Sequence, residues 1–111
     1  MHELGIATDL FKIVEQYAKK NSLKKVTKIT IKLGAASGIE KDFLEHSLKD
    51  HVMVGTFAEG SKLNFKIEKV KFECRDCGKE IKDGDECPYC RGKRIKVTAG
   101  EDVYVESIEG K

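Results

Sequence analysis

Apolar residues recur every three or four positions over residues 5–21, a spacing that predicts an amphipathic helix. The apolar stripe consists of Ile6, Leu10, Ile13, Val14 and Tyr17. The same spacing over residues 39–53 predicts a second helix, with Ser37 as a candidate N-cap and Gly55 as a terminator. The residues expected to face the core from this helix are Ile39, Phe43, Leu44, Leu48 and Val52.

Four other segments have the pattern of strands. VTKITIKLG, residues 26–34, alternates cleanly and predicts a strand with one solvated face. In KLNFKIEKVKFEC, residues 62–74, the alternation changes phase near Glu68, which indicates a bulge or a strand leaving its sheet. KRIKVTAG, residues 93–100, predicts a short strand. EDVYVESIEG, residues 101–110, has apolar residues on both parities, as expected for a strand covered on both faces.

This order of elements predicts an α+β fold, in which a small three-stranded sheet carries two helices on one face. An inserted four-cysteine, zinc-ribbon-like lobe interrupts the sheet. We expect residues 1–72 and 99–111 to form the first domain and residues 73–98 to form the second. Two connections then cross the boundary between the domains.

Composition and charge narrow the class of protein. Of the 111 residues 36% are charged, and the formal net charge is only +2. No apolar run approaches the roughly 18 residues of a membrane span, and no secretory signal is visible, so a cytoplasmic location is expected. In that compartment four cysteines are typical of a metal site rather than of disulfides.

The cysteines form two Cys-x2-Cys pairs separated by nine residues, in CRDCGKEIKDGDECPYC. Two such pairs complete a closed tetrahedral site of the kind that holds structural zinc, with Cys74, Cys77, Cys87 and Cys90 as ligands. A thioredoxin-like redox pair or a rubredoxin-like iron site would use similar motifs. A nucleic-acid-binding zinc ribbon is also open, although residues 74–97 contain seven basic and five acidic residues and one aromatic.

Histidine supplies the other candidate metal ligands. His46 and His51 lie five residues apart in the second predicted helix, a spacing that does not make a chelating pair, and His51 is expected to be partly buried. His2 follows the α-amine of Met1 directly. The amine, the His2 amide nitrogen and imidazole Nδ1 can close adjacent chelate rings around Ni²⁺ or Cu²⁺, with Glu3 as a fourth donor.

Five segments in this order resemble the HypA/HybF family, the nickel metallochaperones of [NiFe]-hydrogenase maturation. They are MHELGIA, ITIKLGAASGIE, GTFAEGSKLNF, the pair CRDC and CPYC, and VYVESIE. The chain departs from the family pattern at Ala35, at Arg91 and in the short spacer between its cysteine pairs.

The resemblance implies a metal-delivery protein and not an enzyme. Nickel is expected at His2 with help from Met1 and Glu3, and structural zinc at the four cysteines. The implied partners are a GTPase of the HypB family and the hydrogenase large-subunit precursor, with no nucleic acid or membrane.

Overall fold

The computed structural model describes the backbone of residues 2–82 and 86–111, and side chains from Leu4 onward within those ranges. The chain divides into two compact units. The first comprises Met1–Leu33, Ile39–Lys66 and Val103–Lys111, and the second comprises Gly34–Gly38 and Ile67–Asp102. The second unit contains the expected insert, residues 73–98, with flanking segments; the division into domains itself stays a prediction.

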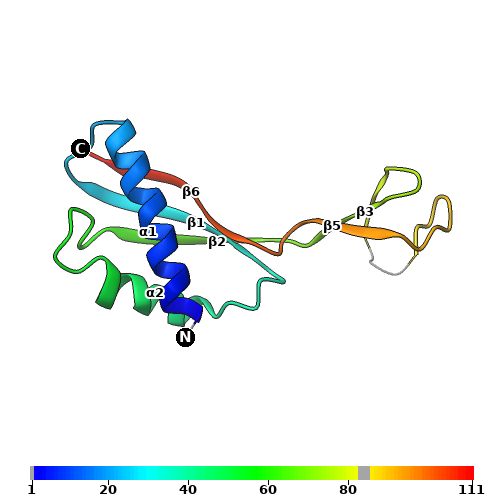
Figure 1. The fold of residues 1–111 in the computed structure, drawn as a ribbon, viewed down its shortest axis with the longest axis horizontal. Helices are drawn as coiled ribbons and strands as arrows, with labels where there is room; N and C mark the ends of the chain where they lie inside the picture. Colours follow the sequence, from blue (N-terminus) through cyan, green and yellow to red (C-terminus); the bar gives the residue numbers. More distant parts are fainter. Residues whose placement is uncertain (1, 83–85) are drawn as a thin grey trace. The chain divides into compact units, whose positions relative to one another are not determined.

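The first unit is built on a three-stranded sheet with the order β2-β1-β6. Its strands are β1 (Val26–Gly34), β2 (Lys62–Glu68) and β6 (Val103–Gly110). Helix α1 (His2–Lys20) lies across this sheet and packs against β6, α2 (Lys41–Ser47) and η1 (Leu48–Val52), as Figure 1 shows. The expected α+β fold, with two helices and a small sheet, is confirmed. In the described parts of the chain no helix is both long and apolar enough to cross a membrane.

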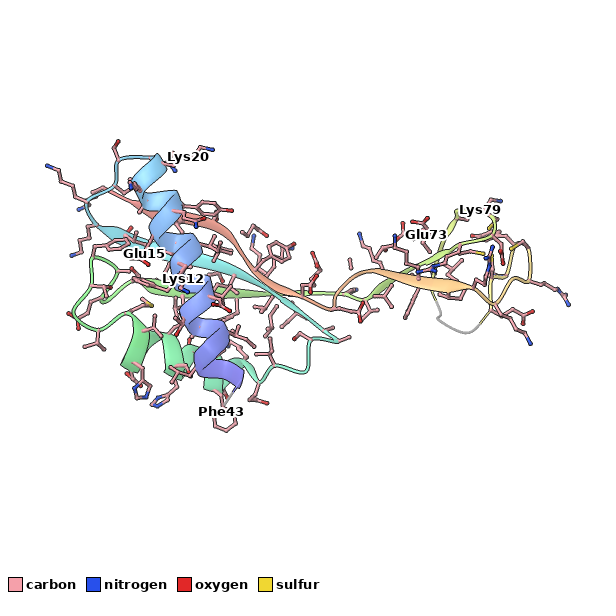
Figure 2. The ribbon with its side chains drawn as sticks, in the orientation of Figure 1. Lys12, Glu15, Lys20, Phe43, Glu73 and Lys79 are labelled. Atoms are coloured by element: carbon pink, nitrogen blue, oxygen red, sulfur yellow. The ribbon has the colours of Figure 1, made fainter. Side chains whose placement is uncertain are left out.

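The buried face of α1 is rotated from the expected stripe. Tyr17 is 37% exposed, whereas Phe11 is buried. The buried residues of α1 are Ala7, Leu10, Phe11, Val14 and Ala18. The ring centroid of Phe11 lies 5.7 Å from that of Phe57. The exposed Lys12, Glu15 and Lys20 lie along the polar side of the helix (Figure 2).

The second helix changes type partway along. It is α-helical over Lys41–Ser47 and π-helical over Leu48–Val52, where the Met53 amide donates to the Leu48 carbonyl, five residues back. Its N-cap is Glu40, so the expected cap at Ser37 is wrong. Leu44 and Leu48 are buried as expected, but Phe43 is 64% exposed (Figure 2). Phe43 lies on the first turn of α2, where the neighbouring Leu44 already fills the core.

Strand β6 is not covered on both faces. It pairs antiparallel with β1, and the register shifts between Thr30, opposite Ser107, and Ile31, opposite Val105. Glu106 is therefore an extra residue in the strand, a β-bulge. Before the bulge the odd-numbered residues, such as Val105, face inward, and after it the even-numbered residues, such as Ile108, do so. This is why apolar residues occur at both odd and even positions of the strand.

The second unit holds another three-stranded sheet with the order β4-β3-β5. Its strands are β3 (Lys71–Cys74), β4 (Glu80–Ile81) and β5 (Ile95–Ala99). The chain leaves the first sheet after Glu68 and enters this one at Lys71, so the phase change near Glu68 marks a strand that changes sheets. Strand β4 has only two residues, too few for any periodicity to predict it.

Gly34 stands where the backbone is too crowded for a side chain. A Cβ there would lie 2.6 Å from the carbonyl carbon of Gly100 and 2.7 Å from the Asp102 oxygen. The neighbouring amides of Ala35 and Ala36 donate to Glu68 and Gly100 at 2.9 and 2.8 Å. The close approach therefore anchors Gly34–Gly38 within the second unit.

Replacing Gly34 by alanine is expected to destabilise the protein by about 1–3 kcal/mol, because both clashing groups are backbone and cannot rotate away. Gly5→Ala is the matched control. Gly5 has open space around it on α1, so alanine there should stabilise the helix by about 0.5–1 kcal/mol. Thermal unfolding of the two variants tests this, and equal effects would contradict the crowding argument.

Candidate metal sites

The four cysteine sulfurs of the second unit converge on one point. Every pair of Sγ atoms lies within 4.8 Å, with Cys74 and Cys90 at 3.5 Å and Cys77 and Cys87 at 3.6 Å. Four thiolates around a tetrahedral ion with bonds of about 2.3 Å would be about 3.8 Å apart, so the sulfurs fit zinc closely. The distances are much longer than the about 2.0 Å of a disulfide, and all four cysteines are free.

Each Cys-x2-Cys pair is folded by the same local turn. The Gly78 amide donates to the Cys74 carbonyl at 2.8 Å, and the Arg91 amide donates to the Cys87 carbonyl at 2.8 Å. Gly78 has φ 77° and Arg91 has φ 59°, so both turns end in the left-handed region. Arg91 holds a conformation that glycine adopts at less cost, since its Cβ is crowded there.

Backbone amides and neighbouring thiols set the protonation of the sulfurs. Burial raises the pKa of Cys87, but the N–H groups of Cys90 and Tyr89 outweigh it and lower the pKa to about 7. At Cys90 the Gly92 N–H lowers the pKa, yet hydrogen bonding with Cys74 and burial raise it to about 12. The pKa of Cys77 is also raised, so Cys87 ionises before Cys77 and Cys90, and those two thiols must release protons as a metal binds.

A charged link joins the two cysteine turns. Arg94, after the second turn, donates from Nε to Asp76 Oδ1 at 2.8 Å, and Asp76 lies inside the first turn. The Arg75 amide also donates to the Arg94 carbonyl at 2.8 Å. A Cβ on Gly92 would clash with the Asp76 carboxylate and lie 3.2 Å from Cys90 Sγ. Asp76 and Arg94 therefore clasp the turns beside the sulfurs.

The structure places the histidines differently from the sequence expectations. His51 is exposed, so the expected partial burial is wrong. The rings of His46 and His51 are 5.1 Å apart between centroids, although a spacing of five was expected to separate them. The π-helical turn that contains His51 brings them together. The candidate nickel ligands Met1, His2 and Glu3 have side chains outside the described residues, and α1 begins at His2.

Comparison with known proteins extends over nearly the whole chain. Residues 1–110 match the HypA family, described as "Hydrogenase/urease nickel incorporation, metallochaperone, hypA". The chain is 37% identical over 112 residues to hydrogenase maturation factor HypA of Aquifex aeolicus, covering 98% of this chain and 96% of that protein. It is 33% identical over 112 residues to hydrogenase maturation factor HybF of Escherichia coli strain K12, covering 98% of each.

Solved structures share the fold. A solution structure of HypA covers 100% of this chain and 97% of its own, with TM-score 0.82 and 26% identity. The solution structure of the Ni metallochaperone HypA from Helicobacter pylori covers 97% of this chain and 96% of its own, with TM-score 0.80 and 24% identity.

An α+β unit joined to a four-cysteine metal-binding unit defines a protein of the nickel metallochaperone class. The chain belongs to the HypA/HybF family of hydrogenase maturation factors. A nucleic-acid-binding zinc ribbon, the alternative left open by the sequence, is not favoured by a match over residues 1–110.

Arg94→Ala should release zinc to a chelator faster, by up to about tenfold, because groups that support the ligands of a metal site set its affinity. The neighbouring exposed Lys96 supplies the control, since Lys96→Ala removes a positive charge from β5 without touching Asp76. Stopped-flow chelator competition on the zinc-loaded proteins measures the rates. If the two variants lost zinc equally fast, the loss of a positive charge, and not of the Arg94–Asp76 interaction, would be responsible.

Proposed function

We propose that this chain binds Ni(II) at its N-terminus and delivers it for the maturation of [NiFe]-hydrogenase. The nickel ligands are the Met1 amine, the His2 amide nitrogen and imidazole, and a donor from Glu3. The observation that carries the proposal is the family match from residue 1 onward, because it includes the N-terminal segment as well as both units. The proposal requires a free amine on Met1.

The start of α1 supports this ligand set. The helix begins at His2, and the first N–H groups of a helix have no partner within it. The His2 amide can therefore lose its proton to a metal without breaking a helical hydrogen bond. The positive end of the helix dipole opposes a bound cation by about 0.3–1 kcal/mol, which favours a site that also gives up its ion.

The four-cysteine site serves a different purpose. Its sulfurs leave no open coordination position for a water or a substrate, which suits structural zinc and not a transported or catalytic ion. Cys74, Cys77, Cys87 and Cys90 hold the zinc. Zinc prefers this tetrahedral sulfur set, whereas Ni(II) accepts planar nitrogen and oxygen donors. The two metals are thereby sorted by ligand chemistry within one short chain.

Delivery requires other proteins. The curated relatives are named hydrogenase maturation factors, and a role of that kind requires contact with maturation machinery. The partners in this proposal are a HypB-family GTPase, which supplies or receives nickel, and the hydrogenase large-subunit precursor, in the cytoplasm. The chain moves a metal ion and does not catalyse a reaction.

Nickel titration of zinc-loaded protein in three forms tests the terminal chelate. The native chain should bind about one Ni(II) tightly, and His2→Ala should lose most of that affinity because it removes the imidazole donor. A form with one or two residues added before Met1 should also lose it. The extension leaves every side chain in place and only moves the free amine.

Zinc content, measured in the same samples, is the control and should stay near one ion per chain. Retention of native nickel affinity by the extended protein would show that the amine is not a ligand. Retention by His2→Ala would remove His2 from the site and with it the whole proposal.

A further inference from the structure

His46 and His51 form a pair of accessible imidazoles on the second helix of the first unit. Their ring centroids are 5.1 Å apart, and the ring planes are inclined at 82°. The side chain of His46 is 60% exposed, and His51 is also exposed. Neither ring is part of the core. Burial in the core therefore does not account for their proximity.

The π-helical turn creates this proximity. In an α-helix the residues that face each other are three or four positions apart, and His-x3-His is a familiar metal-chelating spacing. In the turn Leu48–Val52 the hydrogen bond spans five residues, from Met53 N to Leu48 O. Residues five apart therefore become neighbours on one face. Single π-turns within helices are frequent at functional sites.

Asp50 orients one of the rings. His46 Nδ1 lies 2.6 Å from Asp50 Oδ2, so the Nδ1 proton is held by the carboxylate and Nε2 keeps its lone pair. This arrangement, in which a carboxylate holds the outer nitrogen of a ligating histidine, recurs around protein metal sites, where it fixes the tautomer and makes the free nitrogen more basic. Asp50 thus acts behind His46 and not as a ligand itself.

The ring separation fits one shared ion. A metal–nitrogen bond of about 2.1 Å places a ring centre roughly 3.2 Å from the ion, so two imidazoles at a tetrahedral angle have centres about 5 Å apart. The observed separation is 5.1 Å. Lys49, the nearest cation in sequence, has its Nζ 3.9 Å from Glu45 Oε2, and that carboxylate partly offsets its charge.

We propose that His46 and His51 form a second, two-histidine site for a divalent transition metal, separate from the N-terminus and from the four cysteines. Imidazole nitrogens suit Ni(II), Cu(II) and Zn(II) alike. Two protein ligands leave the remaining positions to water. The ion is therefore held weakly and exchanges readily, and Asp50 is the positioning residue of the site.

Residue-specific footprinting on the zinc-loaded full chain tests the site. His2→Ala serves as the background, to remove the proposed N-terminal chelate. Nickel is the probe, and diethylpyrocarbonate modification of each histidine is read by mass spectrometry. Nickel should protect His46 and His51 together. Adding His46→Ala or His51→Ala should abolish protection of the remaining ring unless the nickel concentration is raised by at least about tenfold.

Asp50→Asn should weaken protection by about tenfold while both rings remain, as expected for a group that supports a ligand. Lys49→Ala is the matched control on the same exposed turn and should leave protection unchanged. Absence of protection in the His2→Ala background would overturn the proposal. So would protection of one histidine that persists without the other, because the two rings would then not share an ion.

Discussion

Four cysteine sulfurs converge on one point in the second unit, where they could hold a single metal ion. The buried cluster of this unit consists of Cys74, Ile81 and Cys87, with Phe72 and Ile95 packed against it. Two of the three buried members are themselves candidate ligands. So small a core does not by itself offset the entropy of ordering the chain, and a metal ion bound by the four cysteines would supply the missing free energy. The clasp between Asp76 and Arg94 and the paired turns then set the shape of that site.

The first unit has the opposite character. Its core contains fifteen buried apolar residues drawn from α1, α2, η1, the sheet and the loop before β2. Binding groups can therefore lie at its surface and remain exchangeable. Both proposed nitrogen-donor sites, the N-terminal chelate and the His46–His51 pair, belong to this unit. The four cysteines all lie in the second unit, so under the proposed function the difference of ligand type would keep a structural ion apart from a transported one.

Much of this could be predicted from the sequence because it depends on local patterns. Cys-x2-Cys spacing predicts two sulfurs per turn, and the alternation in VTKITIKLG predicts a strand. The expected solvated face of that strand is wrong at Thr30, which is buried. The phase change near Glu68 marked the place where the chain changes sheets. Resemblance in five ordered segments identified the family.

Two of the errors arise from backbone irregularity that residue type does not encode. The bulge at Glu106 changes which alternate residues of β6 face the core. The resulting sequence pattern resembles that of a strand buried on both faces. The π-turn at Leu48–Val52 rotates the helix surface, which exposes His51 and brings it beside His46. Phe11 replaces Tyr17 in the core because Ala7 and Ala18 define the contact face of α1. Tertiary packing determines which residues are buried in each of these places, and the periodicity of the sequence alone does not predict it.

X-ray absorption at the nickel and zinc edges of protein loaded with one equivalent of each metal tests the separation of the two ions most directly. The account predicts four sulfur neighbours around zinc at about 2.3 Å and only nitrogen and oxygen neighbours around nickel. Sulfur in the first coordination sphere of nickel, or nitrogen replacing sulfur around zinc, would contradict it.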